Sequence, residues 1–357
     1  MGLDVPVPDW QDAAMYFRRW LFILLASAAA GCACAAGLWL VLPTENQSVF
    51  QNAPDRFYMY VDRLVDGKME QALGGGFYGF TRTPLQIGGT VVYTQFHEGV
   101  DIRPLRHDAR GEPLDPVTAP ADGRVVHVSN VPGNSNYGRY VVVEHTLQGA
   151  PYYTLYAHLA AITVARGDAV RQGDSIGRIG YTGAGINKSR AHLHYEFCLM
   201  LNRNFGGWFK KHHPQTPDTH GIFNGMNLAG LDPVGLTRAV RADPALTVTN
   251  YIRGQTPLFR LIVNATPRFD LLRLYPWLIE GAADPRPAAW AVTFSSQFIP
   301  MRAERRADRV AAPAIEWLGP AAPALIYQSR KLISGTPGKP ALTPAGQRWV
   351  NLLTFPE

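Results

Sequence analysis

Residues 120–180 alternate short β-branched or aromatic runs with glycines, and this pattern restricts the possible fold more than any other feature of the chain. The clearest runs cover residues 123–128, 140–145 and 152–158, and glycines recur between residues 167 and 180. Short strands separated by turn residues are typical of antiparallel sheets, whereas a βαβ fold needs helical segments between its strands. The sequence therefore predicts a mainly β fold built on a compact antiparallel sheet.

Two histidine motifs flank this region. The first reads His97-Glu-Gly-Val-Asp101, the second reads His192-Leu-His194, and His158 lies between them. Side chains two residues apart on a strand point to the same face, so we expect the two rings of the second motif to converge. Histidines combined with a carboxylate are typical of catalytic zinc sites, in which three protein ligands leave a fourth position for water. The motifs supply enough side chains for such a site, with two further imidazoles for proton transfer.

Six segments of the chain, in the same order, resemble the lysostaphin/LytM-type zinc metalloendopeptidase domain, a family of peptidoglycan hydrolases. The resemblance covers about a third of the chain, and its segments are residues 77–82, 97–101, 119–126, 153–159, 164–183 and 192–196. It implies that His97, Asp101 and His194 bind one zinc ion. It also implies that His158 and His192 are the catalytic pair that handles the water and the transition state.

The chain departs from the family pattern just before the second motif. The family has a short segment there, whereas residues 183–190 form a longer one that includes Lys188 and Arg190. This segment is expected to border the substrate groove. Its two cations either contact a carboxylate of the substrate or are solvated, and the sequence leaves both interpretations open.

The resemblance implies a zinc-dependent endopeptidase that hydrolyses peptide cross-links of bacterial peptidoglycan through metal-activated water. Its partners would be the stem peptides and their cross-links. The alternative is a LytM-type regulator without enzymatic activity, which binds and activates other cell-wall hydrolases. Such regulators have lost metal ligands, whereas all five key residues are present in this chain, which favours the enzyme.

Three further side chains are candidates for supporting roles. Glu196 shares a strand face with both histidines of the second motif, so it is expected either to hydrogen-bond a metal ligand or to be purely structural. Tyr93 and Tyr156 are candidate donors to an oxyanion.

The N-terminal segment predicts a membrane anchor. Residues 20–42 contain no charged side chain, and a helix of this length can cross a hydrocarbon core about 30 Å thick. Arg18 and Arg19 precede it and favour a cytoplasmic N-terminus, which places the catalytic domain in the periplasm at the inner membrane. A cleaved signal peptide and a lipoprotein signal, acylated at Cys32 or Cys34, are the alternatives.

The expected organisation has five parts. These are a cytoplasmic N-terminus at residues 1–19, a transmembrane signal anchor at 20–43, a stalk or linker at 44–73, the peptidase domain at 74–235 and a C-terminal accessory region at 236–357. The stalk is expected to contain a short helix near residues 55–71.

The C-terminal accessory region is expected to be an α+β extension. It has strand candidates at residues 246–252, 258–264 and 289–301, and a final helix that begins after Thr343 with a proline in its first turn. We expect this region to shape one side of the groove or to bind an envelope protein partner.

The charge of the chain is mildly positive. The formal net charge is +6, and the positive residues are not gathered into a run. A modest positive excess suits a phospholipid surface or a polyanionic wall. No nucleic-acid-binding motif is recognisable, so nucleic acid is not an expected partner.

Overall fold

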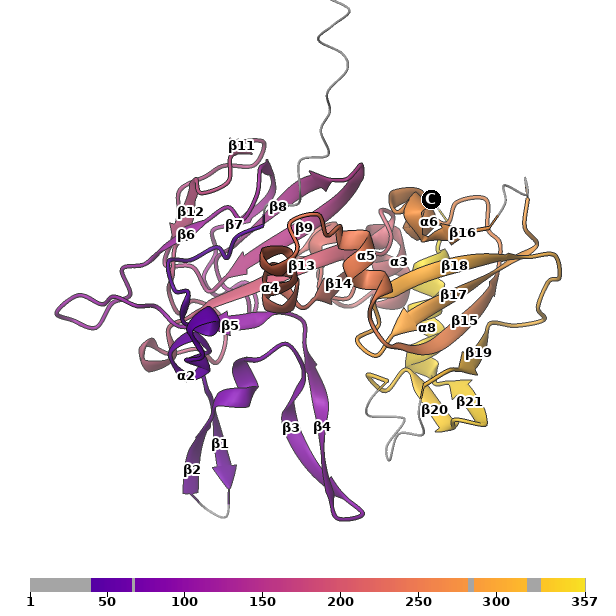
Figure 1. Cartoon of the computed structure of the whole chain (residues 1–357), viewed down its shortest axis with the longest axis horizontal. Coiled ribbons are helices and arrows are strands. Elements are labelled where there is room, and N and C mark those ends of the chain that lie inside the picture. The colour runs from indigo at the N-terminus through magenta and orange to yellow at the C-terminus, as the bar shows by residue number, and fades with distance from the viewer. Residues whose placement is uncertain (1–39, 66–67, 282–285, 320–328, 357) are drawn as a thin grey trace, which may run out of the picture. The chain divides into compact units, whose positions relative to one another are not determined.

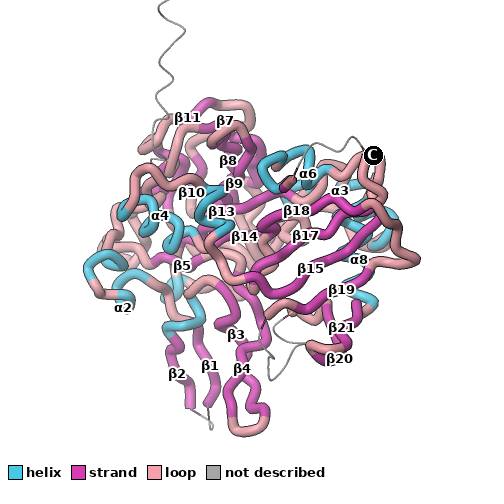
Figure 2. The backbone as a smooth tube through the Cα atoms, turned by 45° about the vertical axis from the view of Figure 1, so that its right-hand side comes forward, coloured by secondary structure: helices cyan, strands magenta, loops and turns pink. Residues whose placement is uncertain are grey.

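Residues 100–231 contain a large antiparallel sheet. The computed structural model describes residues 40–65, 68–281, 286–319 and 329–356, and it confirms the predicted mainly β fold (Figure 1, Figure 2). Within this part of the chain the large sheet has seven strands, six of them in the order β11-β7-β8-β9-β13-β14. Their bounds are β5 (Val100–Ile102), β7 (Gly123–Ser129), β8 (Tyr140–Leu147), β9 (Ala150–Ala157), β11 (Ala169–Val170), β13 (Leu193–Met200) and β14 (Leu228–Leu231).

Strand β13 is the centre of this sheet. One of its edges pairs with β9, and the other edge is shared by β5 at its beginning and β14 at its end. All of its residues are buried. Because three strands surround it, side chains on β13 and β5 are fixed relative to each other by backbone pairing.

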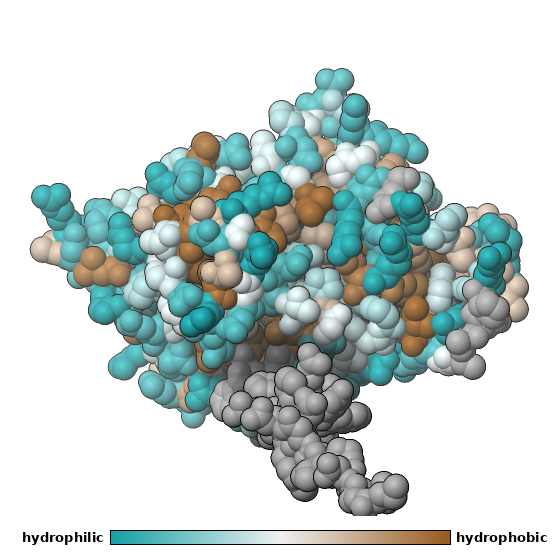
Figure 3. Space-filling model, turned by 90° about the horizontal axis from the view of Figure 1, so that it is seen from above, coloured by the Kyte–Doolittle hydropathy of each residue, from teal (hydrophilic) through white to brown (hydrophobic). Residues whose placement is uncertain are grey.

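Both faces of the large sheet are covered. Along β8, Tyr140 and Val142 belong to one hydrophobic core, whereas Val141 and Val143 belong to the other. Successive strand side chains point to opposite faces, so a strand buried on both sides is apolar at consecutive positions. On the molecular face seen in Figure 3, hydrophobic side chains are interspersed with hydrophilic ones.

Smaller sheets flank the large one. Hairpins β1–β2 and β3–β4 extend side by side away from it, as Figure 1 and Figure 2 show. The bounds are β1 (Val61–Val65), β2 (Lys68–Ala72), β3 (Gly79–Ile87) and β4 (Thr90–His97), with a separate sheet of β6 (Pro116–Thr118), β10 (Ala161–Ile162) and β12 (Ser175–Arg178).

Residues 40–59 contribute buried side chains to the folded core, although the sequence predicted the end of the anchor at 40–43 and a stalk from residue 44. Leu42, Val49 and Phe57 are buried in the core that also contains Leu193 of β13. The predicted helix near residues 55–71 is wrong: among the described residues of this range only those of α2 (Pro54–Phe57) are helical, and β1 and β2 follow. The alternation of exposed and half-buried residues along β1 fits a two-stranded hairpin better than a helix.

The C-terminal region is an α+β arrangement around a second sheet with the order β16-β18-β17-β15-β19. Its strands are β15 (Pro257–Asn264), β16 (Ile279–Glu280), β17 (Ala289–Ser295), β18 (Pro300–Arg306) and β19 (Ala314–Trp317), with a hairpin of β20 (Ile333–Thr336) and β21 (Lys339–Leu342). The segment that leads into this region contains α3 (Phe205–His212) and the start of α4 (Pro233–Ala242). The region itself contains α5 (Val248–Arg253), α6 (Asp270–Leu274) and α8 (Pro344–Thr354).

Of the four sequence expectations for this region, two are met, one is met in part and one is wrong. A strand is present at residues 258–264, and α8 begins after Thr343, whose hydroxyl accepts a hydrogen bond from the Gly346 backbone N–H at 3.0 Å. The predicted strand at 289–301 is instead two strands, β17 and the start of β18, with a turn between them. Residues 246–252 do not form the predicted strand. Instead Thr247 caps α5 by accepting a hydrogen bond from the Asn250 N–H at 3.0 Å, a helix-start signal that outweighs the β-branched composition.

The predicted N-terminus at residues 1–19 lies outside the described residues, and so does almost all of the predicted anchor at 20–43. None of the helices in the described residues combines the length and the apolar character needed to span a bilayer.

Candidate metal centre

Three strands carry the side chains that the sequence predicted as metal ligands. His97 is the last residue of β4, Asp101 is central in β5, and His194 is the second residue of β13. The antiparallel register of β5 and β13 sets Asp101 directly opposite His194. Backbone pairing therefore brings together residues that are far apart in sequence.

A glycine permits the sharp approach between His97 and Asp101. A Cβ atom at position 99 would clash with the backbone oxygen of Tyr195, and it would also lie 2.9 Å from the Cγ atom of Glu196. Only glycine therefore lets the chain leave β4 and pair with β13 within so few residues.

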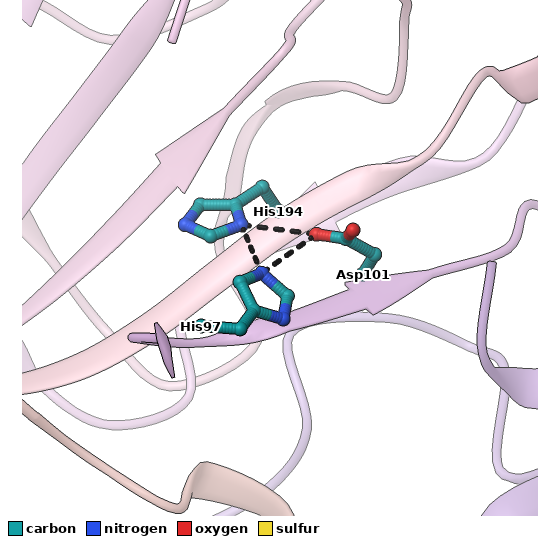
Figure 4. Close-up of side chains that lie close together, drawn as sticks. All are labelled: His97, Asp101 and His194. Atoms are coloured by element: carbon teal, nitrogen blue, oxygen red, sulfur yellow. Dashed lines mark hydrogen bonds and ion pairs between the residues drawn. The ribbon is translucent and has the colours of Figure 1, made fainter. Parts of the chain in front are cut away.

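The three ligand atoms form a nearly equilateral triangle (Figure 4). His97 Nε2 lies 3.1 Å from His194 Nδ1 and 3.2 Å from Asp101 Oδ1, and His194 Nδ1 lies 3.0 Å from the same oxygen. All three residues are buried. Buried polar atoms this close to one another need a cation or a shared proton between them.

The hydrogen bonds behind the two rings fix which nitrogen faces the triangle. His97 Nδ1 donates to the backbone oxygen of Phe77 at 2.8 Å, and His194 Nε2 donates to Glu196 Oε1 at 2.8 Å. In a neutral imidazole the other nitrogen then carries a lone pair. Both lone pairs and a carboxylate oxygen consequently point at one another.

This donor set fits a divalent metal ion. Zinc binds histidine nitrogen and carboxylate oxygen at about 2.0–2.2 Å, so tetrahedral ligands are separated by roughly 3.3–3.5 Å. The observed separations of 3.0–3.2 Å are close to that value. Three acceptors without a cation would repel one another, and two nitrogens with one oxygen suit several first-row metals.

The neighbours of Asp101 and His194 shift the pKa values of both groups. Burial opposes ionisation of Asp101, but His97 and His192 hold the pKa of its carboxyl well below its usual range. Burial also disfavours a charged His194 ring, yet hydrogen bonds to Asp101 and Glu196 raise its pKa to about 9. Without a metal, a proton on His194 takes the place of the cation between two carboxylates.

The predicted catalytic histidines lie beside the triangle. The ring centroids of His158 and His192 are 4.7 Å apart, and the ring of His158 lies 5.8 Å from that of His194. His158 Nδ1 donates to the backbone oxygen of Thr182 at 2.9 Å, and His192 Nδ1 donates to that of Arg190 at 2.6 Å. Both Nε2 atoms are therefore left with lone pairs.

Burial keeps these two rings neutral. It lowers the pKa of His158 well below 6.5, and it lowers the pKa of His192 to about 4. His158 also adopts a left-handed backbone conformation, with φ of 62°, which is uncommon for a residue with a side chain. The backbone is thus held in an unfavourable conformation that aims this ring at the site.

All five predicted residues line one cavity of about 320 Å³. A second cavity of about 370 Å³ adjoins it through Glu98 but is lined mainly by apolar side chains such as Trp208 and Trp349. The histidines and the carboxylate identify the first cavity, not the larger one, as the place for chemistry. The metal-ligand and catalytic roles of the five residues stay predictions.

Two residues of the site were missed by the sequence reasoning. Arg82 Nη2 donates to Asp101 Oδ2 at 2.6 Å and lies 3.1 Å from His97 Nε2. The Tyr137 hydroxyl donates to Glu196 Oε1 at 2.9 Å. Neither belongs to a histidine motif, and only the packing of distant segments brings them to the cavity.

The structure also separates the supporting candidates. Glu196 hydrogen-bonds His194, as one of the two expectations for it proposed. Tyr156 is fully buried and bonds the hydroxyl of Thr154, while Tyr93 is exposed and contacts Arg63. Neither tyrosine lines the cavity of the site, so both were wrong as oxyanion donors, and Tyr137 is the tyrosine found there.

Comparison with known proteins identifies the domain. Residues 95–204 match the model of peptidase family M23. Peptidoglycan DD-endopeptidase ShyA of Vibrio cholerae is 42% identical over 84 residues, which are 24% of this chain and 17% of that protein. DD-carboxypeptidase/endopeptidase Mpg of Neisseria meningitidis is 36% identical over 141 residues, which are 37% of this chain and 28% of that protein.

One solved structure illustrates the extent of the likeness. The catalytic domain of lysostaphin from Staphylococcus simulans is 28% identical to this chain, with a TM-score of 0.25, and the likeness covers 34% of this chain and 76% of that domain. The chain spans less than a third of the length of the two curated relatives above. The sequence match confirms the family resemblance, and this chain therefore contains a peptidase M23 domain.

Proposed function

We propose that the protein is a zinc-dependent endopeptidase that hydrolyses peptide cross-links of bacterial peptidoglycan. The observation that carries the proposal is the convergence of three lone-pair donors with two neutral imidazoles on one cavity. The names of the relatives, a DD-endopeptidase and a DD-carboxypeptidase/endopeptidase, support the substrate class.

The ligand set in this proposal is His97, Asp101 and His194. A zinc ion held there would supply a Lewis acid for the scissile carbonyl and a water whose pKa is lowered to about 7. Arg82 neutralises the outer oxygen of Asp101, so the inner oxygen remains free to bind the cation. Glu196 holds the His194 ring in the orientation that aims Nδ1 at the site.

Proton transfer is assigned to His158 and His192. Each ring presents an Nε2 lone pair, because its Nδ1 proton is bound to a backbone oxygen. One ring accepts the proton of the attacking water and returns it to the leaving amine, and the protonated ring stabilises the developing oxyanion. Their burial excludes bulk water from these transfers.

The location of the protein is also a proposal. The uncharged run at residues 20–42, preceded by two arginines, favours an inner-membrane anchor with the M23 domain in the periplasm. That placement gives the domain access to peptidoglycan.

A single substitution separates the enzyme from a non-enzymatic regulator. We expect the full chain to bind one zinc ion per molecule and to cleave cross-linked muropeptides, and we expect His194→Ala to lose both properties. His107→Ala is the matched control, because His107 is exposed and does not line the cavity. Stoichiometric zinc without cleavage of any cross-linked muropeptide would favour the regulator, and absence of zinc binding would refute the metal centre.

A further inference from the structure

The two cations that precede the second histidine motif have different surroundings. Lys188 and Arg190 belong to the same short turn, η4 (Lys188–Arg190). Lys188 Nζ lies 2.9 Å from Glu112 Oε1 and donates to the backbone oxygen of Arg110 at 3.1 Å. Arg190 instead lines the cavity of the candidate metal centre. The lysine is therefore already paired outside the site, and only the arginine is available within it.

Arg190 is held in place by its backbone and by one side-chain bond. Its backbone N–H donates to Asn187 Oδ1 at 3.1 Å, and its backbone oxygen accepts the Nδ1 proton of His192 at 2.6 Å. Its Nε–H donates to the backbone oxygen of Tyr60 at 3.2 Å. These bonds leave the two terminal nitrogens of the guanidinium for another partner.

The acidic groups of the cavity are already engaged elsewhere. Asp101 is bonded by Arg82 and His194, Glu196 by His194 and Tyr137, and Glu98 lies 3.7 Å from Arg330. Among the described residues, no carboxylate lies within ion-pair distance of Arg190. The site therefore presents a fixed, half-buried guanidinium without a counter-ion beside His192.

Carboxylates are the natural ligands of such a group. A guanidinium donates two parallel hydrogen bonds to a carboxylate and cannot lose its charge at physiological pH. A carboxamide offers only one acceptor oxygen and no charge, so the same position binds it more weakly. A peptide carries free carboxylates on acidic side chains and at its chain end, so a peptide substrate can supply such an anion.

We propose that Arg190 is a specificity-determining residue that binds a free carboxylate of the peptide substrate beside the scissile bond. This inference rests on the proposed peptidase function and narrows it to substrates that carry an anionic group at that position. Lys188 has no part in the subsite.

The test compares cross-linked peptides in which each free carboxylate is replaced in turn by a carboxamide. At one position we expect the replacement to lower kcat/KM of the wild-type protein about ten- to a hundredfold, the usual worth of a hydrogen bond to a charged group. Arg190→Gln should cleave the acid and the amide at similar rates, and Arg190→Lys should restore part of the preference. Lys188→Gln should keep the wild-type preference, and all variants should bind zinc as the wild type does.

Two results would overturn the proposal. Arg190→Gln could slow the acid and the amide equally, which would reduce Arg190 to a support for His192. The wild type could also show no preference at any position. If it cleaves no peptide at all, the peptidase function fails separately, and titration calorimetry with the same peptides decides the subsite. Equal binding of acid and amide by the wild type would then refute it.

Discussion

At the scale of single residues, the outer ring nitrogens of His97 and His194 matter because their hydrogen bonds decide which nitrogen faces the proposed metal site. Phe77 and Glu196 accept the outer protons of His97 and His194, so the inner nitrogens are free to bind a cation. Glu196 is also bonded by Tyr137 and by the Cys198 thiol, at 2.9 and 3.2 Å. A buried carboxylate with three donors is well fixed, and in the proposed metal centre its charge would make the His194 ring a stronger ligand.

We therefore expect Glu196→Gln to lower zinc affinity about 10- to 100-fold while the protein stays folded. The neutral amide still accepts the ring proton, but it no longer increases the basicity of His194. Competition with a chromophoric chelator measures the change. Glu316→Gln is the control, since Glu316 is half-exposed and pairs with Arg260 far from the site. An unchanged affinity in Glu196→Gln would contradict this role.

Short motifs together with the family resemblance predicted five side chains that the structure brings to one cavity, His97, Asp101, His158, His192 and His194. The motifs and the resemblance were not sufficient for Arg82 or Tyr137. Arg82 reaches Asp101 only because β3 pairs with β4, and Tyr137 reaches Glu196 from a loop that precedes β8. Contacts of this kind depend on tertiary packing, which no local pattern encodes.

At the scale of elements, the pairing of β5 with β13 sets the geometry of the candidate metal centre. Gly99 lets the backbone approach Tyr195 closely at the start of β5. Any side chain there would force β5 away from β13 and would move Asp101 away from His194. The separation of β5 and β13 thus sets the distance between Asp101 Oδ1 and His194 Nδ1.

We expect Gly99→Ala to destabilise the protein by about 1–3 kcal/mol, the usual cost of forcing one extra methyl group into a packed site. We also expect a lower zinc affinity, because the added methyl group moves Asp101 away from His194. Urea denaturation and zinc content check the two effects. Gly133→Ala is the comparison, because nothing lies near a Cβ atom at that position. Wild-type zinc affinity in Gly99→Ala would argue against the role of this approach.

A histidine on β7 makes stability depend on pH. Burial, followed by the nearby His220, lowers the pKa of His127 to about 4, and its ring stacks 4.9 Å from that of Tyr140. Below about pH 6.5 this histidine binds a proton in the unfolded chain but stays neutral in the folded protein. The contribution of His127 to the free energy of unfolding should therefore be fully present above that pH and should decline as the pH falls toward 4.

His127→Phe keeps the ring stacking but removes the titration. We expect this variant to lose less unfolding free energy than the wild type between pH 6.5 and 4, with a slope smaller by as much as about one proton. Denaturant titrations at several pH values measure the slope. Equal slopes for the two proteins would show that other groups, such as His145, account for the acid sensitivity.

At the scale of the whole described structure, the M23 domain and the C-terminal region share one hydrophobic core. Phe197 of β13 and Phe259 of β15 belong to the same cluster. The Tyr275 hydroxyl accepts the backbone N–H of Met200 at 2.8 Å, and Asn202 donates to the backbone oxygens of Leu352 and Phe355 at 2.8 and 3.0 Å. The accessory region is therefore integrated with the end of β13.

Asn202→Ala removes the side-chain donor to the Leu352 and Phe355 oxygens and the acceptor of the Asn204 N–H, so we expect it to cost about 2–4 kcal/mol. Because the core is continuous, unfolding in urea should stay a single transition when followed by fluorescence and by circular dichroism. Asn204→Ala, which removes an exposed bond to the Pro356 oxygen, should cost less than about 1 kcal/mol. Two separate transitions would mean that the C-terminal region folds independently.

The sequence was informative about the elements of this region and silent about how they pack. Thr343 and the proline after it predicted α8, since capping is a local interaction. The burial of Val49 and Phe57 was not predicted, because isolated apolar positions in a polar segment resemble a linker until their partners on β5 and β13 are known. Leu42 was assigned to the membrane anchor, because it ends an uncharged run. Domain boundaries stay predictions for the same reason.

Digestion of purified cross-linked peptidoglycan by the full chain, in water enriched in oxygen-18, tests the central claim most directly. Mass spectrometry of the products should find cut peptide cross-links, intact glycan strands and one oxygen-18 atom in each new carboxyl group. Chelation of zinc, or His194→Ala, should abolish all of these products. Cleavage that persists in His194→Ala or without metal, or digestion confined to the glycan, would contradict a peptidase centred on His97, Asp101 and His194.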